Sequence, residues 1–219
     1  MFRSPLHFLL LVAALGILVL LVQFQVLTIA FDKLGLSEHA AYLLLMTTLT
    51  GSFVNVPLFT VDMRVAPDPR LQPPAWFRHR TAGIPGKTIV AINIGGAVVP
   101  LAFCIFLLAN SPVTALEVVV CVLAVSAVAH AFSRPIKGLG IGMPVLVAPL
   151  AAAAIAAAMG AEDARAALAY IGGTLGVLIG ADLLRLKDIR RLGAPIASIG
   201  GAGSFDGIFV TGILAVLLA

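Results

Sequence analysis

The chain has 219 residues, of which 61% are hydrophobic and only 11% are charged, and its formal net charge is +4. Soluble domains carry about 25% charged residues, so this composition excludes an ordinary soluble domain and indicates a multi-pass membrane protein. The basic residues lie where they report membrane topology, so the positive charge predicts no nucleic-acid partner.

Seven apolar runs predict an all-α bundle of seven transmembrane helices, folded as a single domain over residues 1–219. Each helix needs about 20 apolar residues to cross a hydrocarbon core of about 30 Å. The first run exceeds the apolar core of a signal peptide and is interpreted as an uncleaved span. The seven predicted spans are residues 6–30, 40–60, 88–110, 112–132, 143–160, 165–184 and 199–219.

The connecting segments predict the orientation of the bundle. Residues 61–87 form a Pro-rich loop that cannot continue a helix. Every Lys and Arg except Lys33 and Arg165 falls before the first span or in the loops after the second, fourth and sixth spans. Because basic loops stay inside, we expect a cytoplasmic N-terminus and 61–87 loop, with the C-terminus outside. The predicted location is the cell inner (plasma) membrane, with membrane lipids as partners.

The two cysteines, Cys104 and Cys121, fall inside predicted spans. We expect free thiols that pack as small apolar side chains rather than a disulfide. The sequence contains no Cys-x-x-Cys motif and no Cys/His cluster. Neither a metal nor another cofactor is therefore expected.

Two acidic residues, Asp182 and Asp206, lie inside apolar runs. A carboxylate in hydrocarbon costs roughly 2.5–3.5 kcal/mol on insertion scales, so such residues are rare and usually functional. The two predicted helices that carry them are consecutive and antiparallel, so both carboxylates are expected in the cytoplasmic half of the membrane. The pair is predicted to be a catalytic or ion-binding dyad.

Other polar residues are expected at the same depth. Asn55, Asn93 and His130 lie near the cytoplasmic ends of their predicted spans, whereas Glu117 lies near an outer end and is interpreted as structural. The clustering predicts one site that opens to the cytoplasm. The alternative is that each polar side chain forms a hydrogen bond to a neighbouring helix.

Three Gly-rich stretches are expected to break helices or to re-enter the membrane, because irregular backbone at membrane depth survives only beside protein or water. One follows Asn93, one joins the fourth and fifth spans, and one precedes Asp206. Arg134 and Lys137, in the second stretch, are suited to an anion such as a lipid phosphate or to pairing with Asp182. Gly201 and Gly203, in the third, would let the backbone bend closely around a ligand.

Three motifs carry a resemblance to a known family: SRPIKGLGI at 133–141, IGADLL at 179–184 and GGAGSFDGIF at 200–209. They resemble a prokaryotic family of uncharacterised membrane proteins catalogued as domain of unknown function 1614. The likeness extends over the chain from the second predicted span onward. It implies a membrane protein and supplies no activity.

A more distant likeness concerns the order of the aspartates. Presenilins, signal peptide peptidases and prepilin peptidases place one catalytic Asp on a helix and a second, in a Gly-x-Gly-Asp motif, on the next. Here Ser204 and Phe205 separate Gly203 from Asp206, and no Pro-Ala-Leu motif follows. The resemblance implies an intramembrane aspartic endopeptidase with catalytic Asp182 and Asp206 and a transmembrane helix as substrate.

The sequence thus leaves three hypotheses. The first is an intramembrane aspartyl protease-like hydrolase with a cytoplasm-facing Asp pair. The second is a proton- or cation-coupled transporter or channel that uses the same Asp residues, although the outer halves of the spans carry few polar residues. The third is a structural role in which Asp182 pairs with Arg134 or Lys137. Homo-oligomerisation is left open. The expected substrate-binding residues are Asn55, Asn93, His130, Arg134, Lys137, Gly201 and Gly203.

Overall fold

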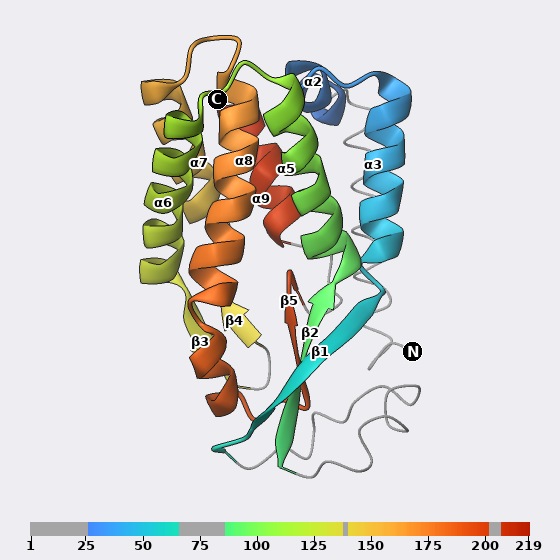
Figure 1. Cartoon of the computed structure of the whole chain (residues 1–219), viewed down its shortest axis with the longest axis vertical. Coiled ribbons are helices and arrows are strands. Elements are labelled where there is room, and N and C mark those ends of the chain that lie inside the picture. Colours follow the sequence, from blue (N-terminus) through green and yellow to red (C-terminus); the bar gives the residue numbers. More distant parts are fainter. Residues whose placement is uncertain (1–25, 66–85, 138–139, 202–206) are drawn as a thin grey trace.

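The computed structural model describes residues 26–65, 86–137, 140–201 and 207–219, and it is mostly helical. The helices stand side by side in a bundle, and a small β-sheet extends from one end of it (Figure 1). The first predicted span, 6–30, falls mainly outside the described residues. Its described end is helical and belongs to α2 (Val26–Lys33).

Helix α8 is central to the bundle. It contacts α5, α6, α7 and α9, and nearly all its side chains are buried. Glycines permit these close approaches, as small residues do in packed membrane helices. A Cβ at Gly172 would overlap the sulfur of Cys121, and one at Gly176 would overlap Val125. The bundle helices are α3 (Glu38–Gly51), α5 (Val99–Asn110), α6 (Ala115–Phe132), α7 (Val147–Met159), α8 (Arg165–Val177) and α9 (Gly207–Leu218).

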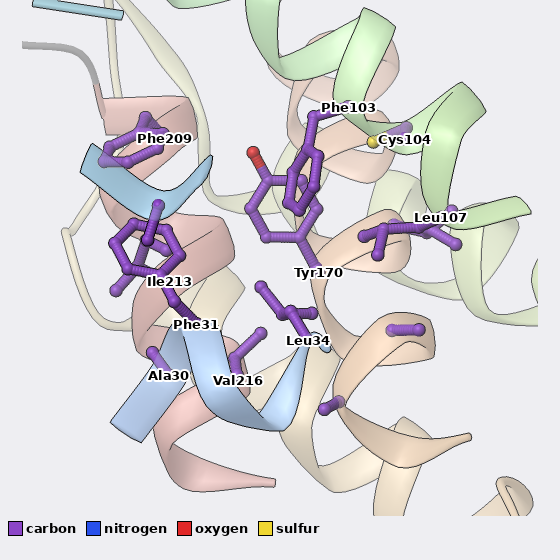
Figure 2. Packing of buried hydrophobic residues seen from close by; sticks show 14 of the residues in the cluster. Ala30, Phe31, Leu34, Phe103, Cys104, Leu107, Tyr170, Phe209, Ile213 and Val216 are labelled. Carbon is purple, nitrogen blue, oxygen red and sulfur yellow. The ribbon is translucent and has the colours of Figure 1, made fainter. Parts of the chain in front are cut away.

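The core at the end of the bundle away from the sheet consists of aromatic and aliphatic side chains. The ring of Phe103 on α5 meets that of Tyr170 on α8 edge to face, with centroids 4.9 Å apart. Phe209 and Ile213 of α9 and residues of α2 complete the cluster (Figure 2). Cys104 and Cys121 are free and buried. This packing joins α2 to the helices that follow it much later in the sequence.

Glu117 has the structural role expected of it. Its backbone N–H donates to Oγ1 of Thr114 over 3.3 Å, and its carboxylate accepts from the Thr114 N–H over 2.8 Å. This reciprocal capping box satisfies donors at the start of α6 that have no partner within the helix. The acidic side chain therefore serves to begin the helix.

The sheet corrects the all-α prediction. Its strands are β1 (Asn55–Asp62), β2 (Lys87–Asn93) and β5 (Ile196–Ile199), in the order β1-β2-β5. Strands β1 and β2 pair antiparallel, and β2 pairs parallel to β5. The end of the predicted 40–60 span and the start of the 88–110 span are therefore strands. Their β-branched residues favour strands, but an apolar run looks alike in a buried strand and a helix.

Where the structure describes them, the Gly-rich stretches form strand, turn or π-helix rather than α-helix. Between β2 and α5 lies a π-helical segment, η1 (Ile94–Val98), and a second one, η2 (Leu178–Leu183), continues α8. The stretch between α6 and α7 forms a short hairpin of β3 (Arg134–Ile136) and β4 (Gly140–Gly142). In the last predicted span, 199–219, the described helix is α9, which begins only at Gly207; Ile199 itself ends β5.

Two helices in the described part of the chain are long and apolar enough to cross a membrane. They are Ala115–Phe132 and Arg165–Leu183, the second being α8 continued by η2. Ile94–Asn110, Val147–Met159 and Ile208–Leu218 are apolar but shorter. The predicted spans 112–132 and 165–184 are thus continuous apolar helices, and the count of seven stays a prediction.

Candidate functional site

Asp182 lies on η2, where the helical bundle meets the sheet. Its carboxylate Oδ2 accepts a hydrogen bond from the backbone N–H of Gly200, over 2.8 Å. Gly200 directly follows the last residue of β5, so this bond ties η2 to the end of that edge strand of the sheet. A π-helical segment inside a longer helix frequently marks a functional position.

Gly200 occupies a position that only glycine fits without strain. Its φ is +83° and that of Gly201 is +100°, both in the region that L side chains rarely adopt. A Cβ at Gly200 would lie 2.7 Å from the backbone nitrogen of Ala97 in η1. The turn is therefore held between the two π-helical segments, with η1 on one side and the Asp182 carboxylate on the other.

Asp182 has no cationic partner among the described residues. The ion pairs there are Lys87–Asp62, at 3.9 Å, and Arg185–Asp188, at 3.2 Å. Arg134 is exposed on β3 and Lys137 is exposed just after it, and neither forms an ion pair with Asp182. The carboxylate is partly buried with a single backbone N–H as its hydrogen-bond donor within this part of the chain.

Two asparagines and a serine form a polar cluster at the same junction. Asn55 begins β1 and Asn93 ends β2, and the antiparallel register places them opposite each other. The amide nitrogen of Asn93 donates to the carbonyl of Ser52 over 2.8 Å and to Oδ1 of Asn55 over 3.1 Å. Ser198 of β5 donates to the same Asn55 oxygen over 2.5 Å. Two donors therefore orient the half-buried Asn55 amide.

Asn93 also begins the π-helical segment η1. Its Oδ1 accepts the N–H of Gly96 over 2.7 Å, and the side chain is 1% exposed. One buried amide therefore links the end of α3, the start of β1 and the first turn of η1. This is a positioning role that holds the sheet against the bundle.

His130 contacts η2 from the neighbouring helix α6. Its Nδ1 lies 3.2 Å from the carbonyl oxygen of Gly180, two residues before Asp182. Because a carbonyl can only accept, this contact needs a proton on Nδ1. A Cβ at Gly180 would overlap the carbonyl of Ser126 on α6. His130 thus lies beside the segment that carries Asp182.

The structure brings together part of the predicted site. Asn55 and Asn93 are in contact, Gly201 follows the Gly200 turn beside Asp182, and His130 reaches the same segment. Asp206 and Gly203 lie outside the described residues. Ser198 and Gly200 were not predicted as site residues, although both belong to the Gly-rich stretch that precedes Asp206. Their roles depend on strand pairing, and the apolar segments that form the strands had been predicted as helices.

In the described part of the chain, no group of three His, Cys, Asp or Glu side chains is arranged to hold a metal ion. The junction instead offers the Asp182 carboxylate at the glycine turn, the linked side chains of Asn55, Asn93 and Ser198 at the strand ends, and the His130 imidazole against η2. Such groups bind protons, cations or a polar substrate segment.

The fold and site define a mostly helical protein whose apolar helices lead into a small sheet, with an acidic side chain at the junction. A family model matches residues 49–218, and the chain belongs to that family, described as "Protein of unknown function (DUF1614)". No curated protein and no solved structure matches the chain. The family resemblance expected from the sequence is therefore confirmed, and the likeness to intramembrane aspartyl proteases stays a prediction.

Proposed function

We propose that the protein is a multi-pass plasma-membrane protein whose sheet end faces the cytoplasm. Large apolar side chains exposed on the outer surface of the bundle support this placement, because lipid tails would cover them. They include Leu101, Ile105 and Phe106 on α5 and Leu116 and Leu123 on α6.

The two ends of the bundle differ in their balance of basic and acidic residues. The sheet end carries most of the described basic residues, whereas the opposite end carries more acidic than basic ones (Figure 1). Basic residues are retained on the cytoplasmic side. At the opposite end the acidic residues are Asp32, Glu38, Glu117, Glu162 and Asp163, and the basic ones are Lys33 and Arg165.

Within that membrane we propose an aspartyl hydrolase of transmembrane helices, with Asp182 and Asp206 as the catalytic residues. The observation that carries this proposal is the bond from Gly200 to the Asp182 carboxylate. It ties Asp182 to the segment that leads along the chain to Asp206. The absence of a cation beside Asp182 in the described residues leaves its carboxylate available for proton transfer.

In this mechanism the two carboxyl groups share one proton and titrate as a pair. The ionised carboxylate takes a proton from water, and the resulting hydroxide attacks the scissile carbonyl carbon. The protonated carboxyl polarises the carbonyl oxygen, the C–N bond breaks, and the leaving nitrogen takes up the proton. Asn55, whose Oδ1 is held by Asn93 and Ser198, presents its NH₂ donors to a substrate carbonyl.

The test is labelling of the full-length protein, in detergent, with a photoreactive hydroxyethylene peptide, a transition-state mimic for aspartyl proteases. Wild-type protein should be labelled, whereas Asp182→Asn and Asp206→Asn should each lose labelling, because one carboxylate alone cannot bind the mimic. Cleavage is measured by sequencing the peptides released from the transmembrane helices of cell membranes. The same two variants should release far fewer of these peptides than the wild-type protein. We expect at least about 100-fold less product, as for loss of a general acid or base.

The matched control is Glu162→Gln, which removes an exposed carboxylate at the opposite end of the bundle. It should label and cleave as the wild-type protein does. Undiminished labelling of Asp182→Asn that inserts and folds normally would contradict the hydrolase proposal.

The second candidate is a proton- or cation-coupled transporter or channel that uses the same aspartates. Buried hydroxyl groups in the bundle favour it, because Tyr170 and Thr174 lie four residues apart on the helix that continues to Asp182. Ser126 of α6 and Thr211 of α9 are also buried. These groups would extend a polar path from the site into the bundle.

Proteoliposomes distinguish this candidate from the hydrolase. Under a pH gradient, the interior of liposomes that contain a carrier should acidify faster than that of empty liposomes, as reported by a trapped pH-sensitive dye. The variants Asp182→Asn and Asp206→Asn should acidify no faster than empty liposomes. The Glu162→Gln protein again serves as the control. A flux equal to that of empty liposomes, for protons and for sodium and potassium ions, would exclude the transporter.

A further inference from the structure

Exposed basic side chains gather at the sheet end of the molecule. They come from three stretches that are distant in sequence: the residues after β1, the β3–β4 hairpin and the 3-10 helix η3 (Leu186–Arg191). Helix η3 contacts both β1 and β3. The backbone N–H of Arg64 also donates to the carbonyl of Arg190 over 2.8 Å. We define the basic surface as Arg64, Arg134, Lys137, Lys187, Arg190 and Arg191.

Arg185 fixes the parts of this surface against each other. Its Nη2 donates to the carbonyl oxygens of His130 and Ser133, over 2.7 and 2.8 Å, and its Nε donates to Oγ of Ser133 over 3.2 Å. These bonds hold the end of α6, and hence the start of β3, beside the start of η3. The cations are therefore presented from a preorganised backbone.

The acidic side chains nearby are engaged elsewhere. Asp62 pairs with Lys87, Asp188 pairs with Arg185, and Asp182 accepts from Gly200. Within the described residues, no side chain of the basic surface forms an ion pair or hydrogen bond. The surface thus carries a concentrated positive charge that an external anion would neutralise.

An apolar rim borders the basic surface. Phe132 and Ile136 are 52% and 45% exposed, and Leu183 and Leu184 are 41% and 56% exposed. In two neighbouring segments, basic side chains therefore begin at corresponding places, after Phe132 and after Leu184, with Ile136 lying between Arg134 and Lys137. This is the pattern of a membrane interface, where hydrocarbon gives way to headgroups.

We propose that the basic surface binds the phosphate groups of anionic phospholipid headgroups in the leaflet that it faces. The inference rests on the membrane placement proposed above, but not on hydrolysis. Arg guanidinium groups bind phosphate oxygens in pairs, and Lys adds point charge. The apolar rim contacts the first methylenes of the same lipids, which favours a lipid over a soluble anion.

The test is native mass spectrometry of the full-length protein in neutral maltoside detergent, titrated with phosphatidylglycerol or phosphatidylcholine. Wild-type protein should retain phosphatidylglycerol in preference to phosphatidylcholine. The double variants Arg134→Gln/Lys137→Gln and Lys187→Gln/Arg190→Gln should each bind it about 25-fold more weakly, at roughly fivefold per charge. The combined variant should lose the preference.

Lys87→Gln is the matched control, because Lys87 is an exposed cation at the same end but already pairs with Asp62. It should bind phosphatidylglycerol as the wild type does. The charge-conserving Arg134→Lys/Arg190→Lys variant should keep the preference. Unfolding midpoints without added lipid should agree among all variants, which separates lost binding from lost folding.

Equal binding of the two lipids by the wild type, or undiminished phosphatidylglycerol binding by the combined variant, would overturn the proposal. Displacement of the lipid by millimolar inorganic phosphate or by an RNA oligomer would also overturn it, in favour of a soluble anion. The titration is repeated on Asp182→Asn, which should bind lipid normally. If Asp182→Asn loses labelling by the hydrolase probe but keeps the preference for phosphatidylglycerol, the two proposals have been tested separately. A failure of the hydrolase proposal would then leave the lipid proposal standing.

Discussion

Gly180→Ala should destabilise the protein by about 3 kcal/mol, near the upper limit of a typical overpacking substitution. Gly180 lies in η2, and a Cβ there would overlap the carbonyl oxygen of Ser126 on α6. A backbone carbonyl cannot rotate away as a side chain can, so the two helices must separate. That separation would also break the contact between His130 and the Gly180 carbonyl.

The measurement is the midpoint of thermal unfolding in detergent, with Gly173→Ala as the matched control. A Cβ at Gly173 would meet Ala152, Thr211 and Ala215 at 3.5–3.6 Å, which is ordinary packing distance. Alanine also favours helix over glycine by about 1 kcal/mol. Gly173→Ala should therefore be neutral or stabilising. Equal midpoints for Gly180→Ala and the wild type would show that α6 and η2 pack less closely than described.

Asn93→Ala should destabilise the protein by about 3 kcal/mol. The buried amide satisfies the Gly96 N–H and the Ser52 carbonyl and also binds Oδ1 of Asn55. Each buried polar group left without a partner costs about 1–3 kcal/mol. The loss should also release the start of η1, since Asn93 is its N-terminal cap.

Asn110→Ala is the control for this second prediction. Asn110 is an exposed amide that donates to the carbonyl of Phe106 within its own helix, over 2.8 Å. Its removal should change stability by less than about 0.5 kcal/mol, as for most surface substitutions. Chemical unfolding followed by circular dichroism measures both variants. A similar small loss in Asn93→Ala would mean that water replaces the amide, which would contradict its burial.

The positions of several helices could be predicted from the sequence, because long apolar runs without breakers leave the helix as the main solution. The runs 112–132, 143–160 and 165–184 correspond to α6, α7 and α8 with η2. The strands could not be predicted in the same way. Val56 and Phe59 of β1 and Ile89 and Val90 of β2 are as apolar as helix residues, and hydropathy carries no information on pairing partners.

The candidate site divides similarly. Asp182, Asn55 and Asn93 could be singled out from the sequence as candidates, because polar side chains in apolar runs are costly and must be satisfied. Ser198 and Gly200 were missed, because their importance arises from β5, which pairs with a strand more than a hundred residues earlier. The expected alternative partners of Asp182, Arg134 and Lys137, instead contribute to the basic surface.

By itself, the sequence determined that the chain is apolar, mostly helical and a member of its family, since these follow from composition, local periodicity and motif. Only the tertiary structure decided that a sheet lies at one end, that Gly200 rather than a cation contacts Asp182, and that cations from three distant stretches form one surface. The physical reason is that hydrophobicity is a local property of a segment, whereas strand register, glycine-mediated approach and charge clustering depend on which segments meet.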